Sequence, residues 1–131
     1  MRLLILFFFS FGVCFTQSDN KTYFTKKIDK NLPPIIDGDI SDEVWKEVDW
    51  QTDFVELQPD ENTQPSNQTK FKLLFDDNAI YVFVKSLINS DEIVNRLTRR
   101  DQLDGDAIYI AFDSNNDKIN SFVFGLSSAG T

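Results

Sequence analysis

The side chains best able to do chemistry are acidic and amide groups in the last third of the 131-residue sequence. Asp113, Asn115 and Asp117 place oxygen atoms at alternate positions, which is typical of the start of a calcium-binding loop. The glycine and the distant glutamate of an EF-hand are absent. A calcium site at these three residues and a plain turn between two strands therefore remain alternative interpretations.

A second acidic cluster contains Asp101, Asp104 and Asp106 and lies beside Arg99 and Arg100. Most clusters of this kind are solvated surfaces with weak ion pairs. In a functional interpretation, Arg99, Asp104 and Asp106 line the rim of a binding face. A glycosidase would need two carboxylates held about 5–9 Å apart across a cleft. The sequence marks out no such pair, so we expect this segment to be non-catalytic.

The composition excludes several other kinds of site. The chain has no histidine, which rules out a Ser-His-Asp nucleophile, a histidine-ligated zinc ion and imidazole acid–base catalysis. It has 13 basic and 21 acidic residues, giving a formal net charge of -8. Nucleic acid is excluded as a partner because its phosphates are repelled by an acidic surface.

Residues 1–16 are predicted to be a signal peptide. Their apolar run ends at Phe15 and is shorter than the roughly 20 residues of a transmembrane span, but it is typical of a secretory h-region. Small residues favour cleavage before Gln17, and acylation of Cys14 is the alternative. We therefore expect an exported protein of the periplasm, the outer envelope or the medium, and its mature chain has no cysteine.

Alternating apolar residues predict strands through the rest of the chain. The predicted strands are Lys70–Phe75, Ala79–Lys85, Asp106–Asp113 and Ser121–Leu126, with a short edge strand around Tyr23–Ile28. A hairpin turn is predicted at Asp76-Asp77-Asn78. Short strands joined by turns, with little helix, indicate an all-β fold, and a β-sandwich is the best match.

One short helix is predicted near Asp42–Val48, after a turn at Asp37-Gly38. Acidic residues crowd its first turn, and its apolar residues fall on one face. Trp45 is on that face, so we expect it in the core. Residues 17–32, which precede the turn, are expected to be a polar lead-in segment.

Four segments resemble the family 9 carbohydrate-binding module. They are PPIIDGDISDEVWKEVDW from residue 33, KFKLLFDDNAIYVFVKSL from residue 70, RLTRRDQLDGDAIYIAFDSNND from residue 96 and SFVFGLSSAG from residue 121. Together they are similar to exported multidomain bacterial proteins that carry such a module at the N-terminus. The most specific pieces are Asp37-Gly38 followed by Trp45, and the strand from Asp106 to Asp113.

The resemblance implies a jelly-roll-like β-sandwich that holds a sugar end between aromatic rings backed by polar groups. It also implies structural calcium and a covalently attached C-terminal domain, commonly a glycoside hydrolase, which would make the full-length protein an O-glycosyl hydrolase. Asp37, Gly38 and Trp45 match residues of the fold. The sugar-binding residues match poorly. The stacking tryptophan falls within 103–105, Tyr109 replaces an acid, and the arginine and asparagine correspond to Gly125 and Ser127.

The remaining aromatic residues are the candidates for a replacement sugar surface. Tyr81, Phe83 and Tyr109 could form an aromatic face on one sheet, which is what saccharide recognition needs. A loop or a further part of the sandwich could equally cover that face. Trp50, next to Asp49, could either pack in the fold or stack on a sugar.

Two functions remain open. In the first, residues 33–131 are a carbohydrate-binding module of an exported protein and bind a polysaccharide or oligosaccharide. The module would serve carbohydrate catabolism through its attached C-terminal region. In the second, they are a structural β-sandwich of a cell-envelope protein that binds no sugar. Only five or six strands are predicted where a sandwich has about seven, so we expect a fragment that is incomplete at its C-terminus.

Overall fold

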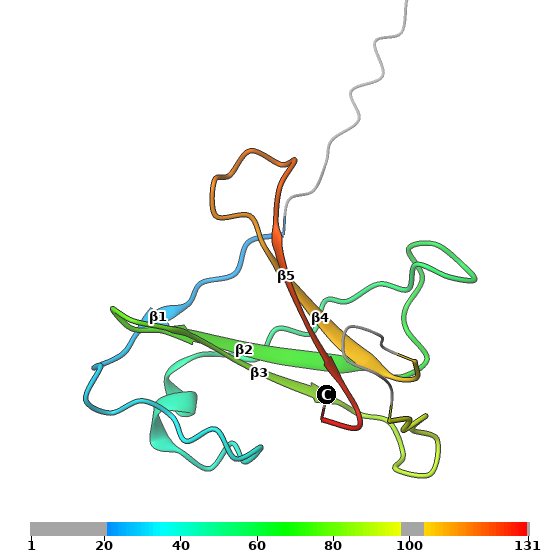
Figure 1. Ribbon diagram of the computed structural model, residues 1–131, viewed down its shortest axis with the longest axis horizontal. Coiled ribbons are helices and arrows are strands. Elements are labelled where there is room, and N and C mark those ends of the chain that lie inside the picture. Colours follow the sequence, from blue (N-terminus) through cyan, green and yellow to red (C-terminus); the bar gives the residue numbers. More distant parts are fainter. Residues whose placement is uncertain (1–20, 98–103, 131) are drawn as a thin grey trace, which may run out of the picture.

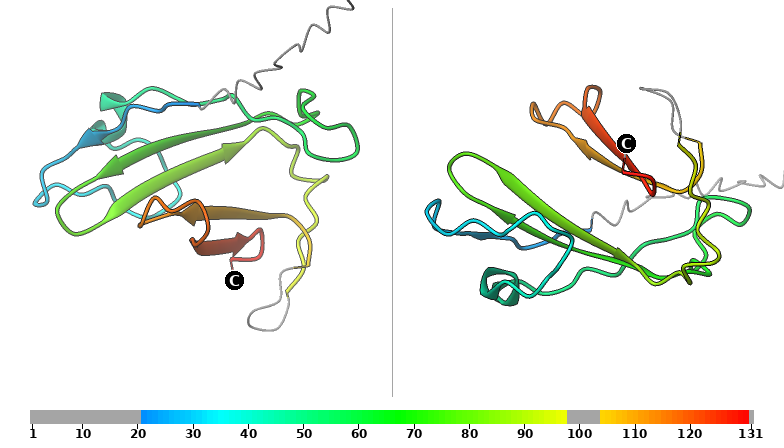
Figure 2. Two further views of the ribbon diagram at one scale, coloured as in Figure 1. Left: turned by 90° about the horizontal axis from the view of Figure 1, so that it is seen from above. Right: turned by 60° about the horizontal axis from the view of Figure 1, so that its bottom comes forward.

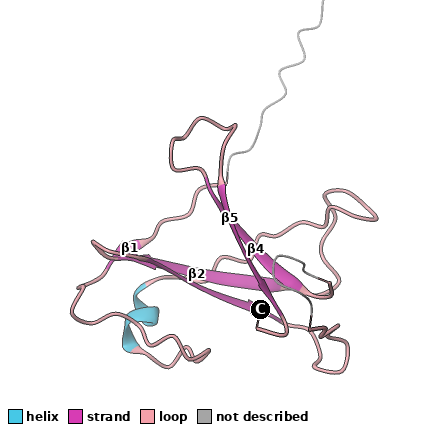
Figure 3. Ribbon diagram, in the orientation of Figure 1, coloured by secondary structure: helices cyan, strands magenta, loops and turns pink. Residues whose placement is uncertain are grey.

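The computed structural model describes residues 21–97 and 104–130 (Figure 1). The predicted signal peptide and Arg99 lie outside these residues. In the described part, one five-residue 3-10 helix accompanies short strands (Figure 3). These elements are β1 (Lys26–Lys27), η1 (Glu43–Glu47), β2 (Thr69–Phe75), β3 (Ile80–Ser86), β4 (Ala107–Phe112) and β5 (Phe122–Ser127). No helix within 21–97 or 104–130 is long and apolar enough to cross a bilayer.

The strands form two sheets that lie as separate layers (Figure 2). In the first sheet, β2 is central, with β1 parallel on one side and β3 antiparallel on the other. The second sheet is the antiparallel pair β4–β5. This arrangement confirms the predicted all-β sandwich. The predicted helix is present, but it is a 3-10 helix of five residues. The Asp42 side chain makes no capping bond to this helix, and its Oδ2 accepts the amide of Ile35 at 2.9 Å.

One face of the first sheet carries the buried core. Leu74 in β2 is fully buried and packs with Trp45 of η1, which is only 3 % exposed. Ile28 and Val48 complete the core, and the Phe83 ring of β3 meets the Trp45 ring edge-on at 5.8 Å. The helix residues that face inward are those with the predicted spacing, so burial of apolar surface explains how η1 is held against the sheet.

The opposite face of the first sheet is turned toward β4 and β5. In β2 it presents Phe71, Leu73 and Phe75, which the strand alternation places away from the buried Leu74. Two apolar cavities, of about 900 and 520 Å³, lie between this face and the second sheet. Both are lined by Leu73 and Ile110. The two sheets therefore face each other without filling the space between them.

Candidate functional site

Tyr109 stands on the outer face of the second sheet. Its neighbours along β4, Ile108 and Ile110, point inward, and its own side chain is 61 % exposed. The residue opposite it in β5 is Gly125, which has no side chain to cover the ring. With alanine two residues away on either side at 107 and 111, the ring is left open, which suits stacking against the apolar face of a sugar.

Trp50, by contrast, is held within the fold. The Nζ atoms of Lys70 and Lys72 lie 4.4 and 5.1 Å from the centre of its ring, within cation–π range. Its ring also meets Phe83 edge-on at 6.1 Å. Lys72 is itself buried and donates a 2.6 Å hydrogen bond to the carbonyl of Trp45. The ring of Trp50 is therefore already engaged by two lysines and by Phe83, although it remains half-buried and lines a cavity of about 480 Å³.

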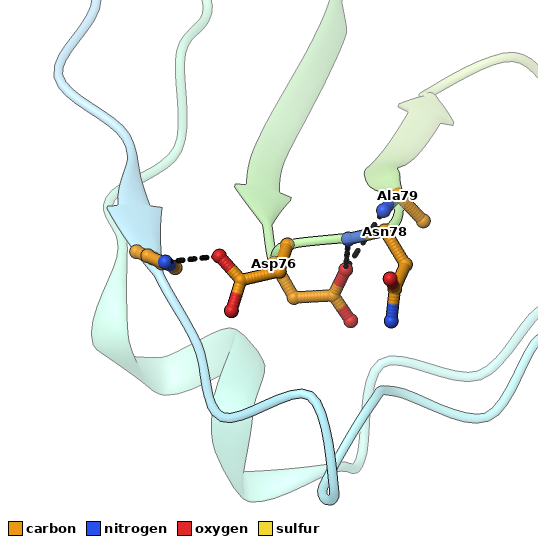
Figure 4. Close-up of polar contacts among 5 residues, drawn as sticks. Asp76, Asn78 and Ala79 are labelled. Carbon is orange, nitrogen blue, oxygen red and sulfur yellow. Dashed lines mark hydrogen bonds and ion pairs between the residues drawn. The ribbon is translucent and has the colours of Figure 1, made fainter.

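Tyr81 is also tied into the fold, through the β2–β3 turn, whose residues Asp76, Asn78 and Ala79 are drawn in Figure 4. Its hydroxyl donates to Asp76 Oδ2 at 3.0 Å, and Asp76 Oδ1 accepts the amides of Asn78 and Ala79, each at 2.7 Å. The Asn78 amide bond is the main cause that lowers the pKa of Asp76. Burial, followed by the bond to Asp76, raises the pKa of Tyr81. Tyr81 and Tyr109 lie in different sheets, so they do not form one aromatic face.

Asp104 and Asp106 fix the entry to β4. Asp106 exchanges two hydrogen bonds with Val94: its amide donates to the Val94 carbonyl at 3.0 Å, and its Oδ2 accepts the Val94 amide at 2.8 Å. Asp104 pairs with Arg96 at 3.0 Å, where both side chains are exposed. Gly105 between them has φ +112°, and a Cβ there would overlap the Val94 carbonyl. These two acids are therefore engaged locally at the start of β4.

The loop after β4 folds around its own carboxylates. Both oxygens of Asp113 accept backbone amides, from Asp117 at 3.2 Å and from Lys118 at 2.8 Å. Asp117 in turn accepts the amides of Ile119 and Asn120 and the side chain of Asn120. These bonds lower the pKa of both aspartates, with the Lys118 amide foremost for Asp113 and the Asn120 side chain foremost for Asp117. In the described residues, no group of three or more acidic, histidine or cysteine side chains could hold a metal ion.

A comparison with known protein families shows to which family this fold belongs. The family model described as "Carbohydrate family 9 binding domain-like" matches residues 36–125. The chain belongs to this family. The match covers η1, β2, β3, β4 and the first part of β5, and it confirms the resemblance read from the sequence. No curated protein and no solved structure matched the chain.

Asp37, Gly38 and Trp45 are the N-terminal residues that match the family 9 fold. Asp37 and Gly38 lie at the surface and Trp45 lies in the core. Asp37 is exposed, and its Oδ1 accepts the amide of Asp39 at 2.8 Å. Gly38 has φ +84°, a left-handed conformation that a glycine adopts without strain. Trp45, buried in the core, has an indole Nε1 without a hydrogen-bond partner among the described residues. These three residues thus position η1 and contribute no group to the exposed face of Tyr109.

One cleft of this family 9 domain was missed by the sequence reasoning. It has a volume of about 510 Å³ and is lined by Tyr23, Phe54 and Phe71 together with Gln51 and Asp53. The Tyr23 and Phe54 rings both pack against the Phe71 ring, with distances of 5.3 and 5.8 Å between the ring centres. Tyr23 and Phe54 come from irregular segments, which are brought together by the Gln51–Phe71 bridge and by the bond from the Tyr23 hydroxyl to the Asp49 carbonyl at 3.0 Å. No local pattern in the sequence signals that pairing.

Proposed function

We propose that this family 9 domain is a non-catalytic module that binds the end of a polysaccharide or oligosaccharide on the ring of Tyr109. The observation that carries the proposal is the open ring on the outer face of β4, opposite Gly125. A pyranose ring has an apolar face and a rim of hydroxyl groups, so an exposed aromatic ring is a suitable platform for it. Polar contacts to the rim would have to come from side chains beside β4.

The wider role that we propose is attachment to a saccharide substrate in carbohydrate catabolism. The apolar N-terminus supports export to the periplasm, the outer envelope or the medium. The resemblance to multidomain proteins supports a covalently attached C-terminal region, such as a glycoside hydrolase. In that role the domain holds the attached region close to its polymer, which raises the effective substrate concentration without any chemistry of its own.

The test is calorimetric titration of the chain with xylan, cellulose and short oligosaccharides derived from them. Tyr109→Ala is expected to weaken binding by about tenfold or more, since loss of the burial of one large side chain costs about 1.5–3 kcal/mol. Tyr109→Phe keeps the ring and is expected to retain most of the affinity. Phe54→Ala is the matched control at the cleft of Tyr23 and Phe54.

Each outcome of this titration has a separate meaning. Binding that is lost with Phe54→Ala and kept with Tyr109→Ala would move the site to the cleft of Tyr23 and Phe54. A folded chain that binds none of the glycans would overturn the carbohydrate-binding proposal for this protein.

The second candidate function is a structural β-sandwich of a cell-envelope protein. It is favoured by the engagement of two predicted sugar-stacking residues within the fold: lysines lie against the Trp50 ring, and Tyr81 is bonded to Asp76. Absence of glycan binding by the folded chain would support this function.

A further inference from the structure

We propose that the cleft of Tyr23 and Phe54 is a second saccharide site, which takes one uncharged pyranose unit of a glycan. Its lining residues lie at positions 21–71, and its volume of about 510 Å³ is usual for a ligand pocket. The cleft has the ligand class of the proposed function but uses no residue of β4 or β5.

Three aromatic rings give the cleft a fixed apolar surface. The rings of Tyr23 and Phe54 are inclined to the Phe71 ring by 52° and 67°. The Tyr23 hydroxyl donates to the Asp49 carbonyl at 3.0 Å and accepts the Leu73 amide at 3.4 Å, so this wall is held in place. Phe54 is 41 % exposed, which leaves part of it open to a ligand. A pyranose can stack its apolar face here at little entropic cost, because the rings are already positioned.

An amide side chain stands beside these rings. Gln51 and Phe71 form an antiparallel bridge, in which each backbone amide donates to the other's carbonyl at 2.9 Å. Residues directly opposite each other in such a pair present their side chains on the same face, so the Gln51 side chain lies on the face of the Phe71 ring. Its amide group has no hydrogen-bond partner within 21–97 and 104–130. It can therefore donate to one sugar hydroxyl and accept from another.

The charges in the cleft favour an uncharged ligand. Lys21 and Asp53 are the charged residues among its described lining, and Lys21 Nζ lies 3.0 Å from Asp53 Oδ2. Lys21 also donates to the Asp53 carbonyl, while Asp53 Oδ1 has no partner in the described part of the chain and can accept a hydroxyl. The pair has no net charge, and the whole chain carries -8. A uronic acid would therefore be repelled where a neutral sugar is accepted.

The experiment is a two-dimensional NMR titration of the isotope-labelled chain with xylotriose, cellotriose and a galacturonate trimer. The Gln51 side-chain amide and the Phe54 backbone amide report the cleft, whereas the backbone amides of Tyr109 and Gly125 report the outer face of the second sheet. At least one neutral trimer is expected to shift the Gln51 and Phe54 signals to saturation. The acidic trimer is expected to leave them unchanged.

Three variants locate the binding. Phe54→Ala removes the stacking ring and should weaken binding in the cleft by about tenfold or more, read at the Gln51 signal. Gln51→Ala removes the amide and keeps the backbone bridge, so it should weaken binding by about two- to tenfold, read at the Phe54 signal. Leu57→Ala is the matched control, because Leu57 is 72 % exposed and does not line the cleft. Its affinity should equal that of the unsubstituted chain.

Asp53→Asn tests the preference for an uncharged sugar. It removes the carboxylate, while Lys21 can keep its bond to the backbone carbonyl of residue 53. The cleft then carries an unpaired positive charge, and this variant should bind the galacturonate trimer. A variant that leaves this trimer unbound would contradict the role assigned to the ion pair.

The outcomes separate this cleft from the Tyr109 platform. Shifts confined to Tyr109 and Gly125, or equal affinity of Phe54→Ala and the unsubstituted chain at the Gln51 signal, would overturn the cleft site and leave the proposed function in place. Shifts confined to Gln51 and Phe54 would support the cleft and remove the platform. A folded chain whose signals respond to none of the trimers would overturn both.

Discussion

Replacing Gly105 with alanine is expected to destabilise the fold more than replacing Gly38, although both glycines are exposed. Gly105 has φ +112°, and a Cβ there would come closer than 3.0 Å to the Val94 carbonyl oxygen, an approach that real Cβ atoms essentially never make. The obstructing atom belongs to the backbone, so no side-chain rotation relieves the overlap. The segment around Val94 must move away from the start of β4.

The magnitude follows from what that movement breaks. The unfavourable φ costs about 1–3 kcal/mol. Displacing Val94 disrupts its two bonds with Asp106, at 3.0 and 2.8 Å, and the 3.1 Å bond that its carbonyl accepts from Ser128 Oγ. Each hydrogen bond contributes about 0.5–1.5 kcal/mol. With two of the three lost, Gly105→Ala is expected to lower the free energy of unfolding by about 2–6 kcal/mol.

Gly38→Ala is the matched control. Gly38 also has a positive φ, +84°, but a Cβ there meets nothing within 4 Å. Only the backbone strain remains, so the cost should be about 1–3 kcal/mol. Urea unfolding followed by far-ultraviolet circular dichroism measures both variants. Equal destabilisation of the two, or a Gly105→Ala variant as stable as the parent chain, would refute the assignment of Val94 and Asp106 as the joint that starts β4.

Two further predictions concern the carboxylates of the turns. Asp76, Asp113 and Asp117 have lowered pKa values, so the stability they contribute is complete above the ordinary aspartate pKa of 3.8 and is lost as the pH falls through their folded values. The melting temperature should therefore be nearly constant from pH 7 to about pH 5 and decrease below about pH 4. The double variant Asp113→Asn, Asp117→Asn should show a smaller decrease of the melting temperature at low pH. A pH profile identical to that of the parent chain would contradict the assignment of this decrease to the two aspartates. Because backbone amides already occupy both oxygens of Asp113, we expect melting curves with calcium and with a chelator to coincide; a midpoint raised by calcium would show a cation bound to the native state.

The strands were predictable because their information is local. Alternation placed Lys70–Phe75 and Ser121–Leu126 within one residue of β2 and β5 at each end. The Asp76-Asp77-Asn78 turn was equally readable, since Asp76 accepts amides only two and three residues away. In each case neighbouring residues in the sequence determine the structure, so a period and a turn signal are sufficient.

The environment of the candidate site residues was not predictable in the same way. Whether the Trp50 ring is free to stack on a ligand or is already in contact with other side chains depends on Lys70 and Lys72. These lysines lie on β2, about twenty residues further along the chain. The need for glycine at position 105 depends on the Val94 carbonyl, which no pattern around the Asp-Gly pair reveals. Alternation placed Tyr109 and Ile110 on opposite faces, but the strand register was needed to put Gly125 beside the Tyr109 ring.

The placement of the two tryptophans has a spectroscopic consequence. Trp45 is buried beside Leu74 in the core, while Trp50 lies against ammonium groups, so the two indoles should emit at different wavelengths and both should report the packing of η1 on the first sheet. Neither lies in the sheet that carries Tyr109. Intrinsic tryptophan fluorescence should therefore change when the chain unfolds and remain unchanged when a ligand stacks on Tyr109.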